Sequence, residues 1–130
     1  MAKNFLICDT GILIRFFRKE QAIENEINTI GLENIAISAI TAAEMYQGMK
    51  NNEERMTKEL INKINVIPMD KSISDRFLSL MIGYKNHIQI PDALIAATAL
   101  EYGYELYTLN IKDFSFVEGI KLYKPKQWKG

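Results

Sequence analysis

Short apolar runs that alternate with helical patterns are the feature that most restricts the fold of this sequence. The first run, at residues 5–8, is hydrophobic without alternation, as in a strand that is covered on both faces of a sheet. Similar runs lie at residues 35–37, 66–67 and 106–109, with a weaker one at 120–123. Since helical segments separate the runs, right-handed crossovers are expected to join parallel strands into a three-layer α/β fold.

The segments between these runs show helical periodicity and helix-ending residues. Ile23 and Ile27 share one helix face, and Gly31 then supplies a stop signal. A helix that begins at Pro91 and ends at Gly103 is apolar nearly all round, which indicates that it is buried. Further helices are expected at residues 12–17, 41–50, 52–64 and 71–86.

Length and composition predict a single domain over residues 1–130, with 48% hydrophobic and 25% charged residues. No apolar stretch approaches the roughly 20 residues that span a bilayer, and no signal-like segment opens the chain, so we expect a cytoplasmic protein without a membrane partner. The single cysteine, Cys8, excludes an internal disulfide and a cysteine-based zinc site. The single histidine, His87, fits a helix end better than a partner for a nucleophilic thiol.

Net charge gives a divided signal about nucleic acid. Sixteen basic and sixteen acidic residues cancel, whereas nucleic-acid binders usually carry an excess of Lys and Arg. If four carboxylates surround a metal ion, the sixteen basic residues face twelve acidic ones elsewhere, a net of plus four. Residues 121–130 also hold four lysines and no acid, which fits either a solvated end or a phosphate-facing patch.

Four acidic residues follow predicted strands or lie early in predicted helices: Asp9, Glu44, Asp92 and Asp113. In parallel α/β sheets, ligands bind beyond the carboxyl ends of the strands. Carboxylates that converge there repel one another unless a divalent cation neutralises them, and oxygen ligands suit Mg²⁺ or Mn²⁺. The pattern therefore predicts a metal site and phosphodiester chemistry.

Two of these acids have competing structural explanations as helix caps. Asp9 is among the best residue types for an N-cap of the helix that follows it. Thr41-Ala-Ala-Glu44 fits a capping box, in which the glutamate bonds back to the helix start. Against that role, Gly48 lies one turn later on the same face, where glycine often marks the close approach of another group. Both roles stay open for Glu44.

Roles other than metal binding are also open for Asp92 and Asp113, and a further one for Asp9. Asp92 lies in a first helical turn, where the helix dipole favours a carboxylate, and Asp113 with Asn110 fits a plain turn. A phosphatase nucleophile at Asp9 needs a second aspartate two residues later, where the sequence has Gly11. A receiver-type phosphoacceptor at Asp9 is a distant alternative that intact-protein mass spectrometry would detect.

The four acids also lie within a recognisable set of motifs. In chain order these are a strand that ends in Asp9-Thr10, then Ser38-x-x-Thr41-x-x-Glu44-x-x-x-Gly48, Asp92-Ala-Leu-Ile-Ala-Ala-Thr-Ala and Thr108-x-Asn110-x-x-Asp113-Phe114. Each piece is weak alone. Together, and in this order, they resemble the PIN-domain ribonucleases, specifically the VapC-type toxins of type II toxin–antitoxin pairs.

This resemblance implies a PIN-like parallel sheet with strand order 3-2-1-4-5 and Mg²⁺- or Mn²⁺-dependent endonuclease cleavage of RNA. The residues that match the family's catalytic and metal-binding set are Asp9, Glu44, Asp92 and Asp113, with Thr108 and Asn110 as supporting polar residues. Many relatives have Ser or Asn where Gly11 stands, so a side-chain hydrogen bond beside the first aspartate is expected to be missing. The alternative is an inactive PIN-like RNA-binding or scaffold module.

The resemblance also implies protein partners. Phe16, Phe17 and Ile23 crowd the first two helices, and apolar surface left exposed there commonly marks a partner site. In the resembling toxins an amphipathic antitoxin segment packs into a groove at this place and blocks the acidic pocket. A cognate antitoxin and a homodimer are therefore expected.

Overall fold

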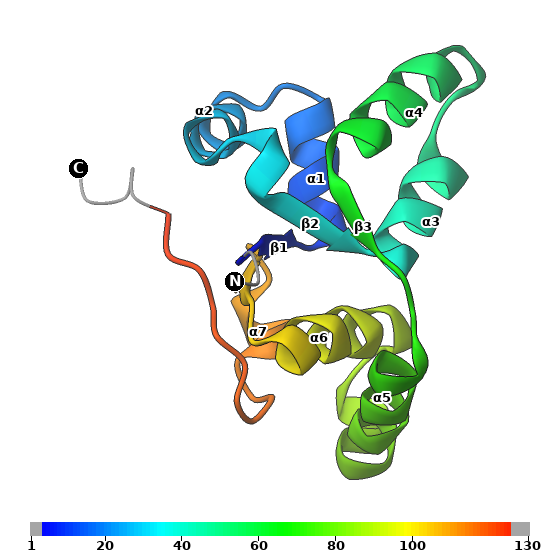
Figure 1. Ribbon diagram of the computed structural model, residues 1–130, viewed down its shortest axis with the longest axis vertical. Coiled ribbons are helices and arrows are strands. Elements are labelled where there is room, and N and C mark those ends of the chain that lie inside the picture. The colour runs from blue at the N-terminus through cyan, green and yellow to red at the C-terminus, as the bar shows by residue number, and fades with distance from the viewer. Residues whose placement is uncertain (1–3, 126–130) are drawn as a thin grey trace.

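A four-stranded parallel sheet in the order β3-β2-β1-β4 forms the centre of the protein (Figure 1). The structure is a computed structural model and describes residues 4–125. The strands are β1 (Leu6–Cys8), β2 (Ile35–Ser38), β3 (Asn65–Ile67) and β4 (Glu105–Tyr107). Central strand β1 aligns Ile7 with Ala36 on one side and with Leu106 on the other. All strand pairs are parallel, as the crossovers predict.

Seven α-helices connect and extend these strands within residues 4–125: α1 (Thr10–Phe17), α2 (Gln21–Ile30), α3 (Ala39–Gly48), α4 (Glu54–Lys63), α5 (Lys71–Tyr84), α6 (Ile90–Tyr102) and α7 (Ile111–Phe114). Three short 3-10 turns accompany them: η1 (Leu32–Asn34), η2 (Asn51–Glu53) and η3 (Lys85–His87). Helix α3 begins two residues before the predicted start because Ser38 caps it. Among residues 4–125, no helix is long and apolar enough to cross a membrane.

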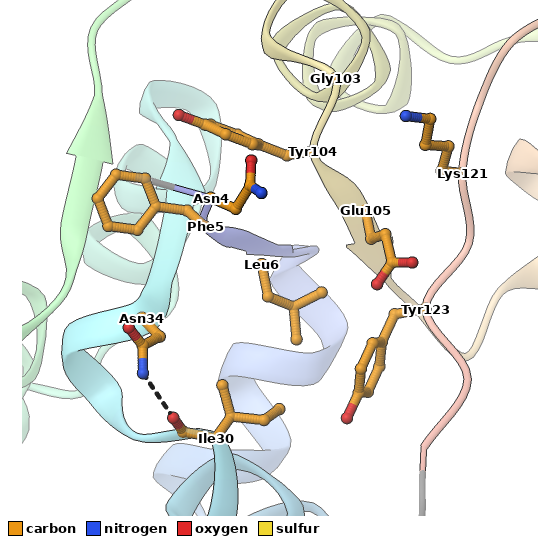
Figure 2. A pocket seen from close by; sticks show the side chains of 10 residues that line it. All are labelled: Asn4, Phe5, Leu6, Ile30, Asn34, Gly103, Tyr104, Glu105, Lys121 and Tyr123. Atoms are coloured by element: carbon orange, nitrogen blue, oxygen red, sulfur yellow. Dashed lines mark hydrogen bonds between the residues drawn. The ribbon is translucent and has the colours of Figure 1, made fainter. Parts of the chain in front are cut away.

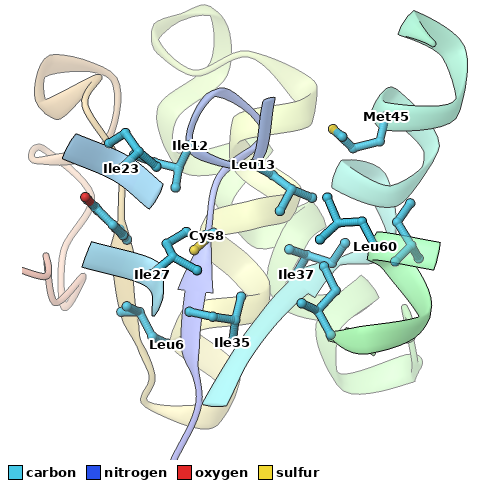
Figure 3. Close-up of a cluster of buried hydrophobic side chains, with 13 residues drawn as sticks. Leu6, Cys8, Ile12, Leu13, Ile23, Ile27, Ile35, Ile37, Met45 and Leu60 are labelled. Atoms are coloured by element: carbon cyan, nitrogen blue, oxygen red, sulfur yellow. The ribbon is translucent and has the colours of Figure 1, made fainter. Parts of the chain in front are cut away.

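The helices form a layer on each face of the sheet. Leu6 and Cys8 pack into a core with α1, α2 and α4, whereas Ile7 between them packs into a second core with α5 and α6. This alternation is the period of two that a strand imposes on its side chains. Figure 3 shows Ile12 and Ile27 reaching toward Cys8 from their helices in the first core. The three-layer prediction is confirmed.

Helix α6 lies closest to the sheet on the second face. Its alanines, among them Ala93 and Ala96, are fully buried against the strands, since small side chains let a helix approach closely. Gly103 ends the helix in the left-handed conformation, with φ of 68°, which glycine adopts at little cost. The packing fixes the first turn of α6, which carries Asp92, at the carboxyl end of the sheet.

The fifth strand is shorter than predicted. Residues 120–123 form a single parallel bridge between Leu106 and Leu122, with Leu106 N–H donating to the Lys121 carbonyl at 2.8 Å. Pro125 lacks an N–H, so the ladder has no donor there to continue. The order 3-2-1-4 is as expected, and the bridge lies where strand five belongs. Residues 126–130, with two of the four terminal lysines, lie outside the described residues.

Candidate functional site

Asp9 follows β1 directly and is 4% exposed. It is the N-cap of α1, and its Oδ1 accepts a hydrogen bond from the Ile12 N–H at 2.9 Å. Its Oδ2 accepts a short hydrogen bond from the Thr108 hydroxyl. The capping role predicted for Asp9 is therefore real, but one carboxylate oxygen remains directed at the neighbouring strand end. Capping and a place in a functional cleft are compatible.

Thr108 and Asn110 form a chain of hydrogen bonds that ends at Asp9. Thr108 follows β4, is almost fully buried, and donates its hydroxyl proton to Asp9. The backbone N–H of Asn110 donates to the Thr108 Oγ1 at 2.9 Å. The Thr108 hydroxyl has one proton, which it donates to Asp9, so its oxygen is free to accept the Asn110 N–H. The two hydrogen bonds together fix the rotation of the Thr108 side chain. Asn110 supports this set through its backbone.

Glu44 is held from another helix. Ser38 is the N-cap of α3 and accepts from the Thr41 N–H at 3.2 Å, so Glu44 lies six residues beyond the cap. At that distance it cannot close a capping box with Thr41, and this alternative is wrong. The Thr10 hydroxyl instead donates to Glu44 Oε1 at 2.5 Å. The first good capping residue after β2, Ser38, sets the helix start and leaves Glu44 for another contact.

Asp92 and Asp113 approach from the opposite layer. Asp92 is the third residue of α6 and is half-buried, whereas Asp113 is exposed on α7. Burial, and after it the charges of Asp113, Asp9 and Glu44 in that order of size, raise the pKa of Asp92 to about 6. The pKa of Asp9 is raised mainly by burial and least by Glu44. The charges of the other three acids therefore act on Asp92, and the charge of Glu44 acts on Asp9.

Ligand type and charge in this acidic pocket (Asp9, Glu44, Asp92 and Asp113) suit a hard divalent cation. Within residues 4–125, however, no three His, Cys, Asp or Glu side chains stand close enough to hold an ion as they are placed. Arg15 lowers the pKa of Asp9 but is itself paired with Glu20 at 2.9 Å. The pocket thus has the oxygen donors and the excess negative charge that fit Mg²⁺ or Mn²⁺, in a more open arrangement than a coordination shell.

Comparison with known proteins assigns the family. The PIN domain profile matches residues 6–118, which is most of the chain. The chain belongs to the PIN domain family. Ribonuclease VapC10 from Mycobacterium tuberculosis is 31% identical over 120 residues, which cover 89% of this chain and 90% of that protein. The VapC-like character predicted from the motifs is confirmed.

Solved structures agree with the fold. A toxin–antitoxin complex from Klebsiella pneumoniae contains a chain that is 33% identical, with a TM-score of 0.76, over 88% of this PIN domain and 94% of that chain. A DNA-bound VapBC structure from Salmonella typhimurium has a TM-score of 0.81 over 92% of this chain and 97% of that chain, at 20% identity. The PIN-like fold class is confirmed, with the fifth strand reduced to a bridge.

Two glycines near the pocket behave differently from each other. A Cβ built on Gly11 would lie 3.6 Å from Asp9 Oδ1, an ordinary contact, so a serine side chain has room beside the first aspartate. A Cβ built on Gly48 would meet no described heavy atom within 4 Å. The close approach predicted at Gly48 is therefore wrong for the described part of this chain. Gly48 instead lines an apolar hollow.

That hollow belongs to a groove along α1 and α4. Two adjoining depressions share Phe17, and Glu44 lines one of them. Phe16 and Phe17 are half-buried in the groove, as expected for a partner surface, whereas Ile23 is 4% exposed and fills the core. Of the three apolar residues, only the two phenylalanines contribute to this surface. Glu44, one of the four acids, thus also lines the groove.

Another hollow, of about 370 Å³, lies at the amino ends of β1 and β4 (Figure 2). Phe5, Tyr104 and Tyr123 form its aromatic lining, and Glu105 and Lys121 lie at its side. It is at the opposite end of the strands from Asp9. None of the four motif acids lines it.

Sequence reasoning assigned no role to Thr10. It holds Glu44, as described above, although no periodicity or cap pattern predicts contact between residues 34 positions apart. The available signal was a run of hydroxyl side chains just after two strand ends, at Thr10, Ser38 and Thr41. Glu26 was also missed, although it lies on the same face of α2 as Ile23 and Ile27.

Proposed function

We propose that this PIN domain is a metal-dependent endoribonuclease that hydrolyses phosphodiester bonds in RNA, and that it serves as the toxin of a toxin–antitoxin pair. The main support is electrostatic: burial, and with it the charges of three other acids from separate segments, raise the pKa of Asp92 at the carboxyl end of the sheet. The ribonuclease name of its Mycobacterium tuberculosis relative supports the reaction class. An RNA substrate implies a cytoplasmic site of action.

The residues have distinct proposed roles. Asp9, Asp92 and Asp113 are proposed as direct or water-mediated ligands of Mg²⁺ or Mn²⁺, and Glu44 as a ligand through water or to a second ion. Such an ion, when bound, supplies positive charge and activates a water molecule for attack on phosphorus. The two donors on Asp9, the Ile12 N–H and the Thr108 hydroxyl, fix its orientation before any ligand arrives. A side chain that is already oriented loses less entropy when the reacting groups are brought together.

The α1–α4 groove is the proposed antitoxin site. The Klebsiella pneumoniae neighbour is named as a toxin–antitoxin complex, which supports a protein partner for this chain as well. Phe16 and Phe17 offer the apolar surface that an amphipathic helix requires, and the open space at Gly48 leaves room for its side chains. Because Glu44 borders both the groove and the pocket, a bound segment would obstruct the acids directly.

A homodimer is proposed through the outer face of α5 and the start of α6. Leu78, Ile82 and Ile90 are 56%, 75% and 60% exposed, and the first two lie one turn apart on α5. Apolar side chains so exposed are costly unless a partner covers them. We expect Ile82→Lys to convert a dimer to a monomer in light scattering after gel filtration. A wild-type protein that is monomeric at high concentration would remove the dimer from the proposal.

Metal removal tests the reaction. An excess of chelator should abolish RNA cleavage, and added Mg²⁺ or Mn²⁺ should restore it and raise the thermal midpoint, since the ion binds the folded state and relieves carboxylate repulsion. Asp9→Asn should be inactive, whereas Asp75→Asn, an exposed acid paired with Lys71, should cleave like wild type. Undiminished cleavage in excess chelator would contradict the mechanism.

The open spacing of the acids also suits a non-catalytic PIN-like module that binds RNA or acts as a scaffold. The chelator experiment separates the two functions, since a scaffold shows no metal-restored cleavage. Expression in cells tests the biological role. The chain alone should arrest growth, and Asp9→Asn or a co-expressed adjacent small reading frame should relieve the arrest. Normal growth with folded, RNA-cleaving protein would leave the nuclease and remove the toxin.

A further inference from the structure

Three hydroxyl side chains lie in a row at the carboxyl ends of β1 and β2. Ser38 Oγ is 3.4 Å from Thr41 Oγ1, Thr41 Oγ1 is 3.0 Å from Thr10 Oγ1, and Thr10 Oγ1 is 2.5 Å from Glu44 Oε1. Ser38 and Thr41 are fully buried, and Thr10 is half-buried at the start of α1. The row therefore runs from the protein interior to the acidic pocket.

Counting protons gives the row a direction. A hydroxyl donates one proton, and an ionised carboxylate only accepts. The Thr10 proton goes to Glu44, so the contact between Thr10 and Thr41 must be donated by Thr41. Thr41 in turn accepts the proton of Ser38. All three hydroxyl protons therefore point toward Glu44, an arrangement in which each bond polarises the next.

We infer that Thr10 is a positioning residue, which fixes the Glu44 carboxylate in the acidic pocket through this directed row of hydroxyl groups. Glu44 sits on α3, behind β2, whereas Asp9 follows β1. Thr10 is the residue directly after Asp9. Its hydrogen bond to Glu44 therefore fixes the position of one acid relative to the other. A glutamate side chain has three rotatable bonds, and without such a bond it would have to be ordered when a ligand binds.

The inference deepens the proposed function, on which its consequence for cation binding rests. Outer hydrogen-bond partners of ligands typically change metal affinity by about 10–100-fold when removed. Thr10→Val keeps the shape of the side chain and removes its proton. We expect Thr10→Val to weaken Mn²⁺ binding by about tenfold or more, measured directly from the free Mn²⁺ signal in electron paramagnetic resonance, and Thr10→Ser to bind like wild type.

Thr98→Val is the matched control. Thr98 is as buried as Ser38 and Thr41, and its Oγ1 donates to a backbone carbonyl, that of Leu94, at 2.8 Å. Its Mn²⁺ affinity should equal that of wild type. Equal affinity for Thr10→Val and wild type would overturn the inference, and so would equal losses in Thr10→Val and Thr98→Val.

A double-mutant cycle tests whether Thr10 acts through Glu44. If it does, the variant with both Thr10→Val and Glu44→Ala should bind Mn²⁺ no more weakly than Glu44→Ala alone. Losses that multiply would overturn the inference. The same cycle on metal-free unfolding in urea separates it from the proposed function. If the protein neither binds Mn²⁺ nor cleaves RNA, the proposed nuclease function is refuted. The contact between Thr10 and Glu44 is still tested in urea: coupled changes in the free energy of unfolding support it, and additive changes overturn it.

Discussion

Two carboxyl groups in this protein are equally buried and have opposite surroundings. Asp9 and Glu26 are both 4% exposed, the first at the end of β1 and the second in the middle of α2. Asp9 has other carboxylates as neighbours, including Glu44 and Asp92. Glu26 has phenols, since the Tyr123 hydroxyl donates to its Oε2 at 2.5 Å.

The difference shows how burial alone fails to mark function. The aromatic rings of Tyr107 and Tyr123 lie 5.1 Å apart, and the Tyr123 hydroxyl supplies Glu26 with a neutral donor from this chain. Burial, with the bond to Glu26, raises the pKa of Tyr123, so the phenol stays a donor. Around Asp9, negative charge accumulates instead. A buried acid that its own chain satisfies is structural, whereas a group of acids with surplus charge calls for a ligand.

The largest expected contrast is in catalysis. Asp9→Asn should lower the rate of RNA cleavage by about a hundredfold or more, because the proposed metal ion would stabilise the transition state by several kcal/mol. Glu26→Gln, which keeps an acceptor for Tyr123, should leave the rate per folded molecule unchanged. Single-turnover cleavage of a fluorescent RNA measures both. A comparable loss in Glu26→Gln would break the distinction between the two carboxyl groups.

Stability should show the next largest effect, on the Glu26 side. Tyr123→Phe removes a donor from a buried carboxyl group and should lower the free energy of unfolding by about 1–3 kcal/mol. Urea denaturation with and without Mn²⁺ measures the change, which should not depend on metal. If Tyr123→Phe is as stable as wild type, the phenol is not what satisfies Glu26.

Charge removal should act in the opposite direction in the acidic pocket. The pKa of Asp92 is raised from its ordinary value of 3.8 to about 6, so its ionised form destabilises the metal-free fold at pH 7. Asp92→Asn should then raise the metal-free stability by about 1 kcal/mol, after allowance for solvent screening at this half-exposed site. The gain should be complete above the folded pKa, fade as the pH falls toward 3.8, and vanish below it.

Saturating Mn²⁺ should reverse that order, because wild type then binds the ion more tightly than Asp92→Asn. Thermal melts across pH, with metal and with chelator, give the comparison. A metal-free Asp92→Asn protein that is less stable than wild type at pH 7 would show that the acids of the pocket do not repel one another.

The smallest effect concerns the second phenol. Among residues 4–125, the buried Tyr107 hydroxyl has no hydrogen-bond partner, and burial with the nearby Glu26 raises its pKa to about 12. Tyr107→Phe removes that hydroxyl and should leave stability unchanged or raise it by up to about 1 kcal/mol. The same substitution thus has opposite expected signs at Tyr107 and Tyr123. A clear loss in Tyr107→Phe would mean that its hydroxyl is satisfied.

Local pattern was enough to predict the layers and the central strands. The apolar stretch at Leu6–Cys8 and the Pro91 and Gly103 signals around α6 are properties of neighbouring residues, and the structure has them nearly where expected. The run at 120–123 forms a single bridge at the expected place instead of a full strand, since Pro125 has no N–H with which to extend the ladder. Strand β3, at the edge, is correct in place but leaves Val66 39% exposed.

The sequence allowed the members of the site to be proposed, but not their contacts to be predicted. Motif order selected the four acids, and their strand-end positions explain why they share one end of the sheet. The bond between Thr10 and Glu44 depends on how α1 packs against α3, which no local pattern contains. The capping box at Thr41 failed for a local reason, because Ser38 caps the helix three residues earlier.

Asp92 and Asp113 also differ in how firmly the fold holds them. Asp92 stands on α6, whose residues Ala93–Ala99 are all buried, so its backbone amides should exchange with deuterium only when the whole domain unfolds. Asp113 stands on α7, a four-residue helix on which it is exposed, and its amides should exchange through local opening. An ion shared by the two carboxylates could then leave through the brief opening of one short helix. If the proposed metal binds, we expect it to exchange rapidly while the sheet stays intact.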